Sequence, residues 1–233
     1  MQTLKEYLAR HYINLDQLAA LTGVAATEIE DLVASKLAPA PSYVVTPARK
    51  LISCVFGEFD ALDALAGKYF HKDGHVWVTQ ARDAQGRLGS ATAREELRAR
   101  FRANFVQALR DINDSLVRLP DTFGEAGELN RARFEERFEE SWEALIEGVY
   151  NLCVADPSNE RSIARKEMLQ EYLQGVSAKV SAGETLDAKE RTRILSLIQQ
   201  YAEAAMPFAP PEYPRSSRKR LVEDFAMLLR NSV

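Results

Sequence analysis

The stretch INLDQLAALTGVAATEIEDLVASKLAPAP, residues 13–41, has the pattern of two short helices joined by a tight turn. Asn14 and Gln17 fit a capping box at the start of the first helix. Gly23 stands where a helix ends in a left-handed residue, and Ile29 and Leu32 lie in the second helix. A helix-turn-helix of this kind is a common way to present a helix to DNA. The segment therefore raises the question of whether the protein binds nucleic acid.

The sequence on either side of this pattern gives the N-terminal unit its limits. Thr3 and Glu6 fit a second capping box, which predicts a short helix over residues 4–11. Pro39, Pro41 and Pro47 predict an extended or turning segment after the helix pair. We therefore expect a helix-turn-helix-like unit over residues 1–48.

The unit resembles the N-terminus of MerR-type regulators, in which the second helix reads DNA. About thirty residues carry the resemblance, and the matching positions are Ile13, Leu18, Ala19, Thr22, Gly23, Val24, Leu37 and Pro39. The resemblance implies a transcription regulator. If DNA is bound, we expect Lys36, with Arg49 and Lys50 just beyond the unit, to contact it. Further phosphate contacts would come from Arg215, Arg218, Lys219 and Arg220.

The second helix departs from that family in two ways. Ala25 stands where the family has a serine that caps the helix. Glu28, Glu30 and Asp31 occupy the helix that carries arginines in the family, and carboxylates repel a phosphate backbone. Residues 1–50 contain five bases and five acids (Lys5, Arg10, Lys36, Arg49 and Lys50; Glu6, Asp16, Glu28, Glu30 and Asp31), whereas DNA-binding units are normally basic. The resemblance thus supports the fold of the unit more than it supports DNA binding.

The rest of the chain carries apolar residues at steps of three and four, which is typical of amphipathic helices. The pattern predicts a helix over residues 48–70 and further helices whose inward stripes include Phe101, Phe134, Ile163, Ile194 and Leu221. Residues 71–90 fit either a short strand or a helical turn at 76–79, followed by a loop at Gly86 and Gly89. We therefore predict an all-α protein, with the N-terminal unit joined to a helical bundle or irregular helical array over residues 49–233.

The second unusual stretch is AMPFAPPEYPRSSRKRLVEDF, residues 205–225. Its prolines favour an extended segment, and a serine then caps a helix whose first turn is basic, which opposes the helix dipole. A bound phosphate or carboxylate would offset this charge. The residues of such an anion site are Arg215, Ser216, Ser217, Arg218, Lys219 and Arg220. The alternative is internal pairing with Glu136, Glu140, Glu143 and Glu147.

Few signs of catalysis or of a cofactor are present. The chain has three histidines, and the two in HKDGH (71–75) are too few ligands for a confident metal site, so we expect no metal and no cofactor. Nucleotide-binding and hydrolase motifs are absent. Cys54 and Cys153 are expected to be free and buried, in a reducing compartment. With 46% hydrophobic and 27% charged residues, a net charge of −4 and no long apolar run, we expect a cytoplasmic protein without a membrane partner.

Over its whole length the chain is similar to a family of bacterial proteins of unknown function. The stretches that carry this similarity are 40–45, 150–173 and 208–220. The similarity implies that the N-terminal unit and the helical body belong together, and it supplies no activity. From the residues we predict a non-enzymatic binding or regulatory protein whose ligand is DNA, a partner protein or a small effector. The alternative is a small-anion-binding protein or an enzyme that uses the basic cluster at 215–220.

Overall fold

The N-terminal third of the chain builds a sheet. The computed structural model describes residues 2–231. Five antiparallel strands have the spatial order β1-β5-β2-β3-β4, and they are β1 (Tyr12–Asn14), β2 (Tyr43–Val45), β3 (Lys50–Ser53), β4 (Gly57–Asp60) and β5 (Gly67–His71). The protein is mostly helical, but the all-α prediction is wrong because of this sheet.

The helix predicted over residues 48–70 is also wrong, and the exposure of its apolar residues explains why. Ile52, Val55, Leu62 and Leu65 are 44, 49, 75 and 73% exposed, so the supposed inward stripe does not face a core. Within β3 the burial alternates instead, with Leu51 and Ser53 inward, as the two-residue period of a strand requires. The apolar residues of this segment are spaced by three and four positions in the sequence, but they lie in separate strands and turns.

The helices of the N-terminal unit form as predicted. The capping boxes at Thr3 and at Asn14 are present, and they start α1 (Leu4–His11) and α2 (Leu15–Thr22). Gly23 ends α2 in the left-handed region with φ 67°, and α3 (Ala26–Ala34) follows without a side-chain cap at Ala25. The pair α2–α3 therefore exists as a structural unit, whereas its use in binding DNA stays a prediction.

Residues 72–88 are helical. A single 3-10 turn, η1 (Lys72–Gly74), leads into α4 (His75–Leu88), which includes Gly86. Of the two expectations for residues 76–79, the helical one is confirmed, and the loop predicted at Gly86 is wrong. Gly89, at φ 72°, provides the break between α4 and the next helix.

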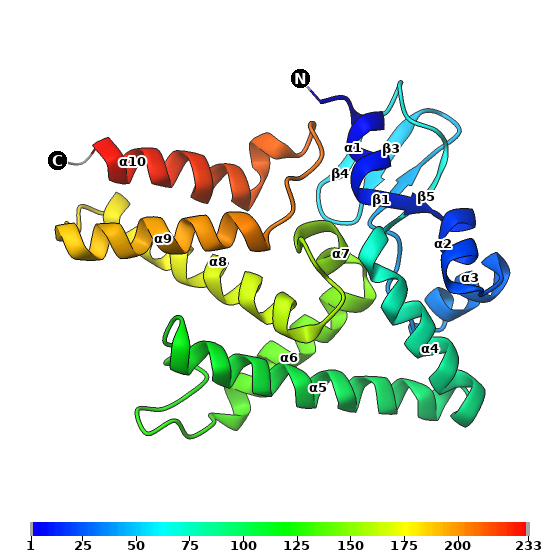
Figure 1. Cartoon of the computed structure of the whole chain (residues 1–233), viewed down its shortest axis with the longest axis horizontal. Helices are drawn as coiled ribbons and strands as arrows, with labels where there is room; N and C mark the ends of the chain where they lie inside the picture. The colour runs from blue at the N-terminus through cyan, green and yellow to red at the C-terminus, as the bar shows by residue number, and fades with distance from the viewer. Residues whose placement is uncertain (1, 232–233) are drawn as a thin grey trace.

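The body contains long helices that bury the predicted stripes. They are α5 (Ser90–Ser115), α6 (Arg131–Ile146), α7 (Val149–Cys153), α8 (Glu160–Ser181) and α9 (Ala188–Ala204), followed by the π-helix η3 (Lys219–Phe225) and α10 (Ala226–Asn231). Phe101, Phe134, Ile163, Ile194 and Leu221 are all buried, as predicted. The sheet lies at one end of the molecule, and α8, α9 and α10 stack at the other (Figure 1).

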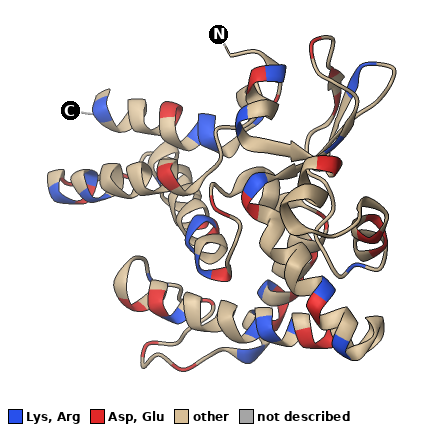
Figure 2. Ribbon diagram, turned by 45° about the vertical axis from the view of Figure 1, so that its right-hand side comes forward, with Lys and Arg blue, Asp and Glu red and all other residues tan. Residues whose placement is uncertain are grey.

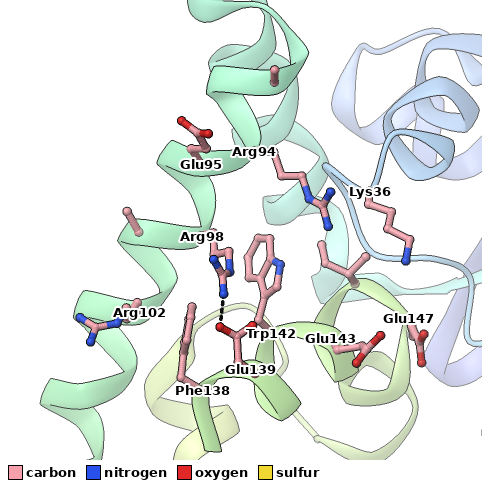
Figure 3. Close-up of a pocket in the computed structure, with 13 residues that line it drawn as sticks. Lys36, Arg94, Glu95, Arg98, Arg102, Phe138, Glu139, Trp142, Glu143 and Glu147 are labelled. Atoms are coloured by element: carbon pink, nitrogen blue, oxygen red, sulfur yellow. Dashed lines mark hydrogen bonds and ion pairs between the residues drawn. The ribbon is translucent and has the colours of Figure 1, made fainter. Parts of the chain in front are cut away.

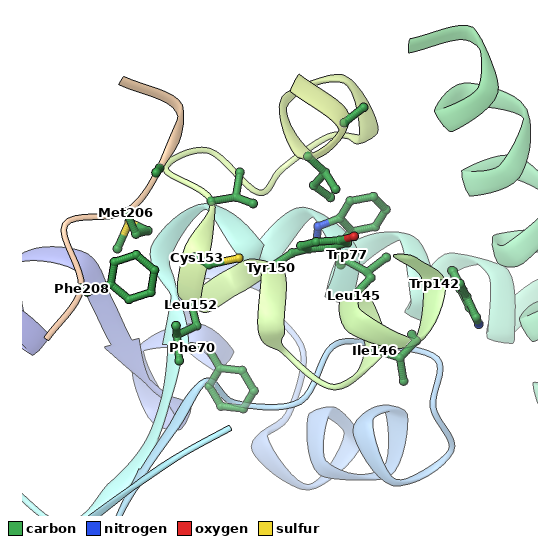
Figure 4. Packing of buried hydrophobic residues seen from close by; sticks show 14 of the residues in the cluster. Phe70, Trp77, Trp142, Leu145, Ile146, Tyr150, Leu152, Cys153, Met206 and Phe208 are labelled. Carbon is green, nitrogen blue, oxygen red and sulfur yellow. The ribbon is translucent and has the colours of Figure 1, made fainter. Parts of the chain in front are cut away.

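The short helix α7 links these two parts. Figure 4 shows Tyr150, Leu152 and Cys153 among buried apolar side chains that include Phe70 of the sheet and Phe208 of the C-terminal segment. Residue 48, the predicted end of the N-terminal unit, lies in the turn between β2 and β3. The division of the chain at this residue stays a prediction.

The proline-rich segment after α9 returns to the sheet. The hydroxyl of Tyr43, on β2, donates a 2.6 Å hydrogen bond to the carboxylate of Glu212, and both residues are fully buried. The other carboxylate oxygen of Glu212 has no partner among the described residues. Burial raises the pKa of the Glu212 carboxyl above its usual value. The hydroxyl of Tyr43 therefore stabilises a group that is costly to bury.

Replacing Tyr43 with phenylalanine should lower the free energy of unfolding by about 1.5 kcal/mol, because a buried carboxylate oxygen loses the shorter of its two hydrogen bonds and keeps only the 3.3 Å bond from the backbone N–H of Ala209. Urea denaturation at pH 7 measures this loss. The matched control is Tyr172→Phe, which removes a hydroxyl that accepts from Arg193 at the surface and should change stability by less than about 0.5 kcal/mol. Equal losses in the two variants would contradict the importance of the Tyr43–Glu212 bond.

Charges of both signs are spread over the helices. Figure 2 shows basic and acidic positions interspersed along the body and around the N-terminal unit. Among residues 2–231, no helix is both long and apolar enough to cross a membrane.

Candidate functional site

Helix α6 separates two cavities. Its residues Phe138, Trp142 and Ile146 face α5 across a groove of about 750 Å³. Arg137, Ser141 and other residues on another face of α6 line a second cavity, of about 460 Å³. We call these the α5–α6 groove and the Lys166 cleft.

The Lys166 cleft lies where the sheet and the helical body meet. It is lined by α6, α7 and α8, by the turn at Val55–Phe56, and by the C-terminal segment. Its charged residues are Arg137, Glu140, Lys166, Glu167, Glu171, Arg215 and Arg220, which amounts to four bases and three acids. The cleft thus gathers residues from parts of the chain that are far apart in sequence.

The buried base at this site is Lys166, which is 2% exposed. Its Nζ lies 2.7 Å from Oε1 of Glu167 and 3.2 Å from Sγ of Cys153. An ammonium has three N–H groups, and a thiol is a weak acceptor. The third N–H therefore has no hydrogen-bond acceptor among the described residues.

The pKa of Lys166 favours the charged form. Burial by itself lowers the pKa of this ammonium, whereas the thiolate form of Cys153 and the carboxylate of Glu167 raise it, and the net direction is upward. Lys166 is consequently a cation at neutral pH. A buried cation with one carboxylate partner is an unusual feature, since buried charges are normally fully paired.

Cys153 does not have the properties of a catalytic thiolate. Burial raises the pKa of its thiol, and Lys166 offsets this only in part, so the thiol is protonated at neutral pH. No histidine is among the residues that line the cleft in the described part of the chain. The prediction that Cys153 is free and buried is confirmed, whereas Cys54 is free but exposed, contrary to the prediction.

The arginines of the cleft differ in how they are paired. Arg137 makes two hydrogen bonds to Glu171, of 2.6 and 3.1 Å. Arg215 donates to the backbone oxygen of Phe56 at 2.8 Å and lies over its ring. The guanidinium of Arg220 has no hydrogen-bond or ion-pair partner within residues 2–231, so it is free to bind a ligand.

The basic cluster predicted at 215–220 does not form one site. Arg215, Ser217 and Arg220 line the cleft, whereas Arg218 turns toward α9 and donates to the backbone oxygens of Ala202 and Ala205. These carbonyls end α9, where the helix dipole attracts a cation. Half of the predicted residues thus lie together at the cleft.

The remaining residues of the cluster have structural partners. Lys219 pairs with Glu223 and Asp224. Ser216 accepts from the backbone N–H of Lys219 at 3.0 Å, so it caps the basic turn as predicted. The acids that offset the positive charge of Lys219 therefore lie on the same helix, η3.

The acids of α6 that were the alternative partners are placed elsewhere. Glu136 pairs with Arg133, and Glu140 lines the cleft without an ion pair to Arg220. Glu143 and Glu147 line the α5–α6 groove. Lys219 is thus paired within the protein, but with Glu223 and Asp224 and not with the predicted acids of α6.

The three residues predicted to contact DNA are not brought together as a basic surface. Arg49 donates to the backbone oxygen of Leu62 at 2.7 Å, and Lys50 pairs with Asp60 at 2.9 Å. Lys36 lies apart from them, at the α5–α6 groove. Their contact with DNA stays a prediction.

The two histidines of HKDGH have structural contacts. His71 is buried, and its Nδ1 accepts from the backbone N–H of Asp73 at 3.1 Å. The Nδ1 of His75 lies 3.0 Å from the backbone oxygen of Lys72. Within the described residues, no three metal-ligating side chains come together.

Sequence reasoning missed Lys166 and Arg137. A signal for Lys166 was present, since it stands three residues after Ile163 and three before Leu169, on the stripe that faces inward. A base at an inward position of a helix indicates a buried charge, and buried charges are frequently functional. Arg137 gave no comparable signal, because its role depends on where α8 lies.

The comparisons with known proteins place the chain in one family. Residues 97–230, more than half of the chain, match a family described as "Family of unknown function (DUF6058)". No curated protein and no solved structure matches the chain. The matched segment includes α6, α7, α8 and the C-terminal segment, which supply the Lys166 cleft apart from its turn at Val55–Phe56. The chain belongs to this family of unknown function, DUF6058.

Proposed function

We propose that the protein binds a small anion, a carboxylate or phosphate compound, in the Lys166 cleft. The observation that carries this proposal is the buried ammonium of Lys166, which lines the cleft with one N–H group lacking an acceptor. An anionic oxygen would complete the hydrogen bonding of this cation. In a site removed from water, such a charge-assisted hydrogen bond is stronger than one at the surface.

Two further groups support an anion at this place. Arg220 lines the cleft without a partner, and its planar guanidinium can make two parallel hydrogen bonds to a carboxylate or phosphate. The hydroxyl of Ser217 also lines the cleft. Its oxygen lies 2.8 Å from the hydroxyl of Tyr201, and this hydrogen bond holds the serine at the cleft. The cleft thus offers donors from α8 and from the C-terminal segment.

The position of the cleft favours a regulatory role over a catalytic one. The turn at Val55–Phe56 connects β3 and β4, so an anion bound here would contact both the sheet and the helical body. Binding would then stabilise one arrangement of the two parts. A catalytic role has less support, because the cleft has neither a thiolate nor a histidine among the described residues.

The macromolecule that the pair α2–α3 would contact is the less supported part of the proposal. If the pair α2–α3 bound DNA, α3 would present Glu30 and Asp31, which are exposed. Two nearby bases are already paired with acids of α3, Lys68 with Glu30 and Arg82 with Glu28. Contact with a partner protein is therefore better supported than contact with DNA as the use of this unit.

Anion binding should depend on Arg220. With inorganic phosphate, succinate and citrate as probes, at least one should raise the melting temperature of the protein, because a ligand that binds the folded state stabilises it. Replacing Arg220 with alanine should weaken that binding about tenfold or more, since a hydrogen bond to a charged group is lost.

The matched control is Arg110→Ala, which removes an exposed arginine of α5 outside both cavities. Isothermal titration of wild type and both variants gives the affinities. Equal affinities in Arg220→Ala and Arg110→Ala would refute the site, and so would the failure of all three anions to bind the wild type.

A further inference from the structure

The α5–α6 groove has walls of opposite charge. On α5, Arg94, Arg98 and Arg102 follow one another at steps of four and so share a face. On α6, Glu139, Glu143 and Glu147 do the same. Aromatic and aliphatic side chains of α6 form the floor between them (Figure 3).

One end of the groove is closed by ion pairs between these walls. Arg98 pairs with Glu139, and its guanidinium lies 5.0 Å from the centre of the Phe138 ring. Arg102 pairs with Glu135 in the same way. At this end the two helices therefore satisfy each other's charges.

The other end of the groove is different, because its charges are unpaired. Lys36, Arg94, Glu143 and Glu147 all line the cavity, and none has a hydrogen-bond or ion-pair partner for its charged group within residues 2–231. Figure 3 shows Arg94, from α5, and Lys36, from the α3–β2 loop, above Glu143 of α6 and Glu147 at the C-cap of this helix. Glu95, on α5, points away from this group. Cationic and carboxylate side chains therefore face the same cavity, and no ion pair between these four residues bridges its walls.

The backbone at Lys36 is an independent observation. Lys36 has φ 55°, in the left-handed region that favours glycine. The turn after α3 would form with less strain if this residue were glycine, so the lysine side chain has a cost to the fold. Strained residues of this kind are found preferentially at functional sites. The turn is closed by a hydrogen bond from the backbone N–H of Leu37 to the carbonyl oxygen of Leu32, and it places the ammonium of Lys36 at the open end of the groove.

Trp142 supplies a neutral donor to the same end. Its side chain is 6% exposed and lines the groove, and its indole N–H has no acceptor within the described part of the chain. A tryptophan that is largely buried normally donates this hydrogen to a partner, as Trp77 does to the backbone oxygen of Pro157 at 2.7 Å. An acceptor supplied by a ligand would fill this role.

We propose that this end of the groove binds a ligand with a carboxylate and an ammonium group, the chemistry of a free amino acid or of a short peptide with free termini. Lys36, Arg94 and the indole of Trp142 would receive the carboxylate. Glu143 and Glu147 would receive the ammonium. The site is separate from the Lys166 cleft, because the two cavities lie on different faces of α6.

A length series of unbranched ligands tests the proposal by isothermal titration. Glycine and alanine carry the two charges at the same short separation, and dialanine and tetra-alanine carry them at increasing separation. N-acetyl-tetra-alanine lacks the ammonium, and tetra-alanine amide lacks the carboxylate. We expect at least one ligand with both charges to bind, and for the peptide each blocked form to bind about tenfold more weakly, as expected for the loss of a charge-assisted contact.

Two double variants assign each wall to one end of the ligand. Lys36→Ala with Arg94→Ala should remove the advantage of tetra-alanine over its amide. Glu143→Gln with Glu147→Gln should remove its advantage over the N-acetyl form. All four side chains are exposed, so the variants should fold normally. Arg110→Ala is the matched control and should leave the affinities unchanged.

The results of the titrations distinguish a free amino acid from a short peptide as the ligand. Binding that is as strong for glycine or alanine as for tetra-alanine indicates an amino acid, and binding that grows with length indicates a peptide. The proposal is overturned if no compound with both charges binds, or if blocking either end has no effect. It is also overturned if the double variants bind like wild type.

Discussion

Replacing Lys166 with methionine should raise the free energy of unfolding by about 1–3 kcal/mol and abolish anion binding. Burying a cation costs desolvation free energy, and because the thiol of Cys153 is protonated at neutral pH, Glu167 is the one charged group bonded to the ammonium among the described residues. Exchanging buried ion pairs for apolar side chains is often neutral or stabilising. Methionine has a similar length and fills irregular space. Glu167 would not be stranded, because its side chain is 30% exposed and can be hydrated.

Urea denaturation of wild type and variant measures the gain in stability, and titration with the anion that binds best measures the loss of function. Lys179→Met is the matched control, since it removes an exposed lysine from the same helix and should change stability by less than about 0.5 kcal/mol. A loss of stability of several kcal/mol in Lys166→Met would show that the Lys166–Glu167 pair is structural. Retained binding would exclude Lys166 from the site.

A gain in stability with a loss of binding would also explain why a lysine stands on an inward stripe of α8. Functional sites often hold groups that the fold alone would not favour. Cys153, which contacts Lys166, gives the ammonium little compensation. The ligand would be the missing partner, so binding and stability should be linked more strongly in the wild type than in the variant.

The local features of the fold could be predicted from the sequence, and the non-local ones could not. The capping boxes at Thr3 and Asn14 and the left-handed Gly23 involve residues within a few positions of one another, and all three formed. The sheet depends on pairing between distant segments, such as Tyr12 with His71. Its strands are three to five residues long, too short for a clear period of two. The apolar residues of 51–65 therefore fitted a helical period by coincidence.

The candidate site was predictable in part for the same reason. The unusual charge at 215–220 is visible in the sequence, and Arg215, Ser217 and Arg220 do reach the cleft. That Arg218 would instead contact the end of α9 depends on tertiary packing. Lys166 could have been found from its place on an inward stripe. Its proximity to Cys153 spans thirteen positions and two helices, and no local rule predicts it.

Acidification from pH 7 to pH 4 should cost the folded protein about 3 kcal/mol through His71 alone. His71 is 1% exposed, and burial lowers the pKa of its imidazole to about 4, with Lys72 and His11 acting in the same direction. In the unfolded chain the imidazole takes up a proton near its ordinary pKa of 6.5. The stability that a neutral His71 provides is therefore complete above pH 6.5, is lost as the pH falls from 6.5 to about 4, and does not change further below that.

His71→Asn isolates this contribution. Asparagine can accept the hydrogen bond from the backbone N–H of Asp73, as Nδ1 of His71 does, but it does not titrate. Urea denaturation at pH 7, 5.5 and 4 should show that wild type loses about 3 kcal/mol more than the variant over this range. The carboxylates near His71, Asp73 and Asp156, are present in both proteins, so their effect largely cancels in the difference.

Parallel curves for wild type and His71→Asn would mean that the folded protein holds a charged or freely titrating His71. That result would also weaken the conclusion that the histidines of residues 71–75 have a structural role. A neutral His71 whose Nδ1 already accepts from the backbone has one ring nitrogen occupied, which counts against its use as a metal ligand through that atom. Diverging curves would therefore support both the low pKa and the role of His71 as a buried cap of the turn that leads into α4.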